Sequence, residues 1–193
     1  MKLYYSPGAC SLASHIALIE SGQGFEKTKV DLGTHRTEDG TDFRTISPRG
    51  YVPAIETDDM GLLTENPAVL TYIANATTQV SDHAVHYKRL EWLGFIGTEI
   101  HNAFGPLFGG ADGEAKEKAK AKVADKFAMA ETLMDGREWL VGDGPTVADN
   151  YLFVTLLWAD KFDIDLPQSL KDFRARNMDR PAVKQAMAEE GLN

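Results

Sequence analysis

Apolar positions in the first eighty residues alternate between the two-residue period of strands and the wider spacing of helices. The segments KLYYS (2–6) and FEKTKVDL (25–32) predict two strands. Between them, Leu12 and Ile16 recur at helical spacing, and Gly22 is suited to end that helix. The order predicts a parallel strand–helix–strand unit at the start of the chain.

The next segments predict further elements of the same α/β domain. TDFRTIS (41–47) predicts one or two helical turns, and residues 51–64 predict a hairpin that turns at DDMG. A helix follows, with Asn66 as its expected N-cap and Pro67 at its first helical position. We therefore expect a mixed sheet with helices packed on it.

Beyond residue 86 the strand signals disappear and helical patterns follow one another. The expected helices span residues 87–104, 114–136, 146–162, 169–179 and 181–191. Thr146 and Asp149 have the spacing of a capping box, and the helix that they open is apolar on nearly all sides. It should be the buried central helix of an all-helical domain. We predict two domains, 1–80 and 87–193, with the boundary between residues 78 and 86.

Charge, hydropathy and cysteine content argue against several classes of function. The 193 residues carry 29 acidic and 20 basic side chains, a formal net charge of -9, so general nucleic-acid binding is not expected. No apolar run reaches the length of a membrane span, and the first residues lack the apolar centre of a signal peptide. A single cysteine suits a reducing compartment. These features predict a cytoplasmic protein that binds no membrane.

The single cysteine, Cys10, lies between a predicted strand and the helix that it feeds. Backbone N–H groups at a helix N-terminus favour the thiolate, so a reactive thiol is one interpretation. A small buried residue is the other. Position 13 holds Ala13 where dithiol oxidoreductases carry a second cysteine, so chemistry that needs an internal resolving thiol is excluded.

Two further features suit an extended, charged peptide. Pro53 opens a strand, so it belongs at an edge, at a bulge or after a cis bond. A cis bond would turn the Val52 N–H and C=O outward for pairing, whereas a trans edge proline would not. Glu65 and Asn66 at a helix start suit the ammonium and carboxylate of an amino acid, although a plain cap is the alternative.

His101 is the candidate acid or base of the helical segment. It shares a helix face with Phe104, and an imidazole there can exchange a proton with a thiol, unless it is only structural. Among the aromatic residues, Trp158 is the pocket candidate. The remaining histidines are assigned structural roles, although a binding role stays open for His35: His15, His35, His83 and His86. No set of residues has metal-ligand spacing, so no metal is expected.

Several segments together resemble the bacterial beta class of cytosolic glutathione transferases over essentially the whole chain. They are MKLYYSPGACSLASHIALIESG, SPRGYVPAI, LLTE, TVADNYLF and RPAVKQAMAEEGL. The resemblance implies an α/β thioredoxin-like N-terminal domain, an all-α C-terminal helical domain, glutathione as co-substrate and a homodimer. It makes Cys10 and His101 catalytic. The substrate-binding residues that it implies are His35, Tyr51, Val52, Pro53, Glu65, Asn66, Phe104 and Trp158.

Three positions depart from the pattern of that class. His35 and Asn102 stand where lysines are common, and Gly94 replaces an asparagine. An exposed charge contact is worth about 1 kcal/mol or less, so weaker glutathione binding is expected rather than none.

The leading hypothesis is a transferase that conjugates the glutathione thiol to a small hydrophobic electrophile. A monothiol disulfide reductase or peroxidase that acts through Cys10 is the first alternative. A non-catalytic binding protein on the same scaffold is the second, because fold does not fix function.

Overall fold

The computed structural model describes residues 1–77 and 82–192, and it divides the chain into two compact units. The N-terminal unit combines Met1–Ser81 with Arg180–Asn193, and the helical unit is Asp82–Asp179. The units differ from the predicted domains in the last helix, which was expected in the helical domain. Of the predicted boundary, residues 78–81 lie outside the described residues.

The N-terminal unit is built on a five-stranded sheet of order β3-β2-β1-β4-β5. β1 (Lys2–Tyr5) pairs in parallel with β2 (Glu26–Asp31) and antiparallel with β4 (Ala54–Thr57). β5 (Gly61–Thr64) completes the predicted hairpin with β4, and β3 (Arg36–Thr37) pairs antiparallel with β2. The predicted mixed sheet is confirmed. The two-residue β3 is too short for a periodic pattern to show.

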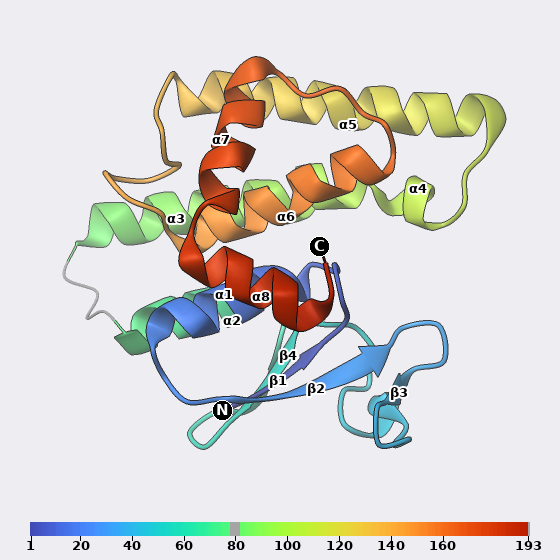
Figure 1. The fold of residues 1–193 in the computed structure, drawn as a ribbon, viewed down its shortest axis with the longest axis vertical. Coiled ribbons are helices and arrows are strands. Elements are labelled where there is room, and N and C mark those ends of the chain that lie inside the picture. The colour runs from blue at the N-terminus through green and yellow to red at the C-terminus, as the bar shows by residue number, and fades with distance from the viewer. Residues whose placement is uncertain (78–81, 193) are drawn as a thin grey trace. The chain divides into compact units, whose positions relative to one another are not determined.

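The helices α1 (Ser11–Ser21) and α2 (Asn66–Thr77) lie side by side against this sheet (Figure 1). α1 ends as predicted, with Gly22 in the left-handed conformation at a φ of 66°. The 41–47 segment forms only a single 3₁₀ turn, η1 (Phe43–Thr45).

The expected N-cap of α2 is wrong by one residue. The structure places Asn66 inside the helix, and the carbonyl of Glu65 accepts the hydrogen bond from the Val69 N–H at 2.9 Å. Glu65 therefore occupies the N-cap position, and Pro67 is the second helical residue. This shift frees the Asn66 side chain for contacts elsewhere.

The last helix, α8 (Pro181–Glu190), packs on α1 of the N-terminal unit (Figure 1). Its buried side chains include Val183 and Ala186, and Arg180 just before it forms an ion pair with Glu20 of α1. Periodicity identified the helix but carries no information about which unit covers its apolar face.

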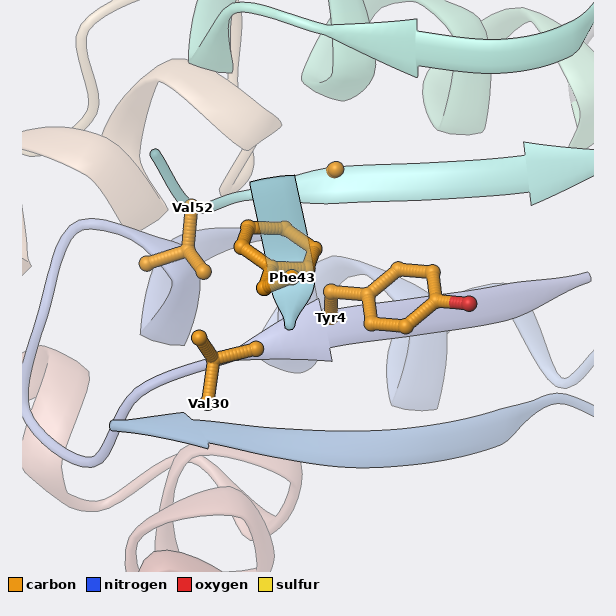
Figure 2. Close-up of a cluster of buried hydrophobic side chains, with 5 residues drawn as sticks. Tyr4, Val30, Phe43 and Val52 are labelled. Atoms are coloured by element: carbon orange, nitrogen blue, oxygen red, sulfur yellow. The ribbon is translucent and has the colours of Figure 1, made fainter. Parts of the chain in front are cut away.

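A cluster of buried side chains connects β1, β2, η1 and the segment that leads into β4. Figure 2 shows the labelled members gathered there, and the cluster comprises Tyr4, Val30, Phe43, Val52 and Ala54. The rings of Tyr4 and Phe43 lie 5.2 Å apart. Because Val52 is only 7% exposed, its side chain is anchored inward while its backbone lies at the start of β4.

The helical unit surrounds one buried helix, as predicted. Its elements are α3 (His83–Phe95), the π-helix η2 (Ile96–His101), α4 (Gly105–Phe108), α5 (Gly113–Met134), α6 (Val147–Lys161) and α7 (Gln168–Met178). α6 is buried along nearly its whole length and packs against α3 and α7. Its capping box is confirmed, since Thr146 and Asp149 bond each other's backbone N–H groups.

Candidate active site

Cys10 directly precedes α1, at the end of the loop that leaves β1. Its Sγ donates a hydrogen bond to the carbonyl oxygen of Val52 at 3.2 Å. The Val52–Pro53 peptide bond is cis, which decides between the two alternatives that the sequence left open. The thiol and the backbone before β4 therefore meet, although they are 42 residues apart in the chain.

The N–H of Val52 has no hydrogen-bond partner among residues 1–77 and 82–192. A backbone N–H without a partner is rare in folded proteins, because leaving it unpaired away from water is costly. Next to the Cys10 thiol and just before β4, this N–H is suited to pair with the backbone of an extended peptide.

The protonation state of Cys10 differs from the sequence-based prediction. Burial raises the pKa of the thiol to about 12, against the opposing effect of the backbone N–H groups of Cys10 and Ser11. Desolvation of a thiolate outweighs these two N–H groups. The expectation that the helix N-terminus makes Cys10 a thiolate is therefore wrong, and the group is a neutral hydrogen-bond donor at pH 7.

Asn66 connects the starts of α1 and α2. Its Oδ1 accepts a hydrogen bond from the buried hydroxyl of Ser14 at 3.0 Å, and its Nδ2 donates to the carbonyl of Cys10 at 3.2 Å. The side chain is thus directed inward, and only its backbone is left for a ligand. Sequence reasoning missed Ser14, whose only signal is its position one helical turn after Cys10.

Glu65 lies immediately before α2 in the left-handed backbone region, at a φ of 71°. Its carboxylate forms an ion pair with Arg49, and both side chains are well exposed. This partner was also missed, because nothing in the spacing of the two residues relates them. The acidic group predicted to hold an ammonium ion is therefore present at the surface, beside a cation.

The remaining predicted residues of the N-terminal unit lie in the segments before β4. His35 has a φ of 55°, and its buried Nδ1 has no hydrogen-bond partner in the part of the chain that the structure describes. A Cβ on Gly50 would approach that nitrogen to 2.9 Å, so glycine is needed for the imidazole to fit. Tyr51 is 70% exposed.

In the helical unit, the structure brings His101 and Trp158 together. Their rings lie 4.8 Å apart, and His101 Nδ1 lies 2.7 Å from the hydroxyl of the buried Tyr151. Burial lowers the pKa of His101 below its ordinary value of 6.5, so the imidazole is neutral at pH 7. Tyr151 was missed because its apolar neighbours assign it to the core.

The stability of the protein is expected to fall as the pH drops below about 6.5, in part because of His101. The unfolded histidine binds a proton there that the folded one resists, so the free energy of unfolding rises with pH across this window. Urea unfolding at pH 7.5 and pH 5.5 measures the effect. A His101→Gln variant should lose less stability on acidification, and an equal loss in both proteins would contradict the assignment.

Phe104 and Trp158 are both buried, and their rings lie 5.4 Å apart. The member of this aromatic group that reaches the surface is Phe108, which is 46% exposed and 5.1 Å from Trp158. Phe104, which directly precedes α4, is directed inward instead, with its ring 6.1 Å from that of Phe127 in α5.

Family models for two successive domains match the chain. The glutathione S-transferase N-terminal domain matches residues 1–75, and the C-terminal domain of the same family matches residues 95–181. The glutathione S-transferase GstA of Escherichia coli O157:H7 is 39% identical over 200 residues, which cover the whole of both chains. The chain belongs to the glutathione S-transferase family. A second relative, GST-4.5 of Xanthomonas campestris, is 38% identical to this transferase with full coverage of both.

Solved structures confirm the fold class and the resemblance to the beta class. A sphingomonad glutathione S-transferase complexed with glutathione is 43% identical and superposes with a TM-score of 0.94 over the whole of both chains. The bacterial beta-class transferase of Sphingomonas chungbukensis is 39% identical, with a TM-score of 0.90 and the same coverage. This transferase thus has a thioredoxin-like N-terminal domain and a helical C-terminal domain.

Within residues 1–77 and 82–192, no helix is both long and apolar enough to cross a membrane. In the same ranges, no group of three or more His, Cys, Asp or Glu side chains could hold a metal ion.

Proposed function

We propose that this transferase joins the sulfur of glutathione to an electrophilic carbon of a small hydrophobic molecule, as a homodimer in the cytoplasm. Cys10 and His101 are the proposed catalytic residues. The proposed substrate-binding residues are His35, Tyr51, Val52, Pro53, Glu65, Asn66, Phe104, Phe108 and Trp158. The electrophile would contact the aromatic group of the helical unit, where Phe108 supplies the exposed apolar surface.

The observation that supports this proposal most is the pairing of the Cys10 thiol with the Val52 carbonyl beside the unpartnered Val52 N–H. An extended tripeptide that bonds to the Val52 backbone would place its central cysteinyl sulfur near Cys10. Glu65, one residue before α2, would attract the ammonium of the γ-glutamyl end. The free N–H groups at the start of α2 would attract its carboxylate.

The chemistry requires the glutathione thiolate. Its sulfur attacks the electrophilic carbon, a carbon–sulfur bond forms, and the leaving group departs with the electron pair of its bond to carbon. The thiol proton of glutathione goes to solvent. When the backbone of glutathione pairs with the Val52 carbonyl in place of the Cys10 thiol, the S–H of the neutral Cys10 can donate to this thiolate instead, which stabilises the reactive form. Positioning and hydrogen bonding would therefore supply the rate enhancement.

The disulfide-reductase alternative requires Cys10 itself as a thiolate nucleophile. Because burial raises its pKa to about 12, that species is scarce at pH 7. Conjugation without covalent participation of Cys10 is accordingly the function that we propose. A Cys10→Ser variant should keep thioether formation with chlorodinitrobenzene within about tenfold of the parent, since a hydroxyl can still donate. Loss of all conjugation in this variant would contradict the proposed role.

Calorimetric titration with glutathione tests the binding half of the proposal. Val52→Pro removes the backbone N–H, and Val52→Ala is the matched control that keeps it. We expect Val52→Pro to bind glutathione about tenfold more weakly than Val52→Ala, the equivalent of about one to two hydrogen bonds. Thermal melting of both variants checks that each is folded at the titration temperature. Equal affinities would contradict backbone pairing at Val52.

If titration of the parent protein with millimolar glutathione produced no heat, the whole proposal would be overturned and a non-catalytic protein would be favoured.

Sedimentation of the parent protein tests its oligomeric state, because a homodimer has twice the mass of the 21.2 kDa chain.

A further inference from the structure

An exposed lysine lies over the aromatic rings of the helical unit, and the proposed chemistry does not use it. Lys161 is the last residue of α6, and its Nζ lies 5.5 Å from the centroid of the Phe108 ring and 5.7 Å from that of the Phe162 ring. Figure 1 shows α4, which ends at Phe108, beside the C-terminal end of α6. Two elements of one unit thus supply a cation and an exposed apolar ring at the same place.

The rings beneath this lysine belong to one aromatic group, made of Phe104, Phe108, Trp158 and Phe162. The Phe108 ring lies 5.1 Å from Trp158 and 5.3 Å from Phe162, and Phe104 lies 6.0 Å from Phe108 on the buried side. Phe104 and Trp158 are buried, whereas Phe108 is exposed and Phe162 is partly exposed. A ligand therefore reaches the group at Phe108 and Phe162, which are the two rings under the ammonium.

The Lys161 ammonium has no anionic partner within residues 1–77 and 82–192, where its side chain forms neither an ion pair nor a hydrogen bond. Of the acidic residues nearest in the chain, Asp160 pairs with Arg174, and Asp163 forms no ion pair with this lysine. A cation above an aromatic face keeps its N–H donors available for an acceptor. A carboxylate brought to these rings would meet three unused donors.

A lysine in the last turn of a helix also stabilises that helix, because the C-terminus carries partial negative charge. This role does not require the ammonium to lie over two rings, and it does not depend on the charge of a ligand. The formal net charge of the chain, -9, repels anions in general. A local cation at the aromatic group would therefore decide whether an anionic ligand is accepted there.

We infer that Lys161 is a specificity-determining residue of this transferase, which selects aromatic electrophiles that carry a carboxylate or a similar anionic group. The ring of such a molecule would pack on Phe108, and its anionic group would accept a charge-assisted hydrogen bond from the ammonium. The consequence for turnover rests on the proposed function. The binding of an aromatic anion does not.

Two electrophiles that differ in charge test the inference: chloronitrobenzoate and chloronitrobenzamide, with the chlorine para to the carboxylate or amide and ortho to the nitro group. In both, the glutathione thiolate attacks the carbon that bears chlorine and a carbon–sulfur bond forms. Chloride departs with the electron pair of the carbon–chlorine bond, and the thiol proton goes to solvent. The readout is the charge preference, defined as the ratio of the two kcat/KM values after each is divided by its uncatalysed rate.

Three variants are compared with the parent: Lys161→Gln, Lys161→Arg and Lys171→Gln. Lys171 is the matched control, because it is an exposed lysine of the same unit that pairs with Asp165. The charge preference should fall about tenfold in Lys161→Gln and stay within about threefold of the parent in Lys161→Arg. In Lys171→Gln it should stay within about twofold. Added salt should lower the preference of the parent and leave that of Lys161→Gln unchanged.

The ratio of two substrates in one protein does not depend on the folded fraction, so lost helix stability does not affect it. A parent-like charge preference in Lys161→Gln would overturn the inference, as would an equal fall in Lys171→Gln.

Binding is measured separately with nitrobenzoate, which lacks the chlorine and cannot react. Saturation-transfer NMR without glutathione should show binding about tenfold weaker in Lys161→Gln than in the parent. Equal binding to both proteins, or none to the parent, would overturn the inference. Binding that depends on Lys161 in a protein that forms no thioether would support the inference and refute the proposed function alone.

Discussion

Iodoacetamide is expected to alkylate Cys10 about a thousandfold more slowly than it alkylates a free cysteine at pH 7.5. Burial raises the pKa of this thiol from 9.0 to about 12, and only the thiolate attacks the reagent. Three pKa units correspond to about a thousandfold smaller thiolate fraction. The hydrogen bond from Sγ to the Val52 carbonyl adds to the effect, because it holds the proton on sulfur.

The measurement is a series of alkylation rates between pH 7 and pH 10.5. The rate should continue to rise with pH over the whole range, whereas a thiolate stabilised by a helix N-terminus would give a plateau below pH 8. The same chain unfolded in urea is the control, and its rate should approach that of free cysteine. A plateau near neutral pH in the folded protein would restore the disulfide-reductase alternative.

Replacement of Asp149 by alanine is expected to lower the free energy of unfolding by about 3 kcal/mol or more, which is a large share of the stability of an ordinary domain. The buried carboxylate accepts hydrogen bonds from the Leu140 N–H at 2.9 Å and from the Thr146 N–H and hydroxyl, both at 2.7 Å. Alanine would leave these donors without that acceptor at the start of the central helix.

Urea denaturation of three proteins measures this effect. Thr146→Ala removes only the hydroxyl of the capping box and should cost about 1 kcal/mol. Asp149→Asn keeps an acceptor oxygen and should fall between the two alanine variants. A loss under 1 kcal/mol for Asp149→Ala would show that the cap is not what holds the loop at Leu140 to α6.

The patterns that predicted the fold were those with local causes. The 2.0 and 3.6 residue periods identified the strands and helices, and Thr146 with Asp149 defined a helix start, because these features depend on neighbours in the chain. The placement of α8 could not be predicted in the same way. Its apolar face fits any hydrophobic partner, and only the tertiary structure selects α1.

For the candidate site too, the residues could be predicted from the sequence, whereas their contacts across the fold could not. Cys10, Val52 and Asn66 were recognised from their types and positions, and the structure brings them together. Their chemistry depended on contacts across the fold, such as the pairing of Asn66 with Ser14 and the proximity of Tyr151 to His101. The pKa of Cys10 was predicted in the wrong direction, because the helix N-terminus is visible in sequence and the depth of burial is not.

The return of α8 to the N-terminal unit has a consequence for biosynthesis. During translation, the segment 82–179 leaves the ribosome between the first strands and the helix that completes their unit. Until α8 has emerged, the Glu190 carboxylate cannot accept the hydrogen bond from the Gly8 N–H or pair with the His15 imidazole. A recombinant fragment that stops at residue 81 would lack this carboxylate. The N-terminal unit therefore cannot be produced from one continuous segment of the gene.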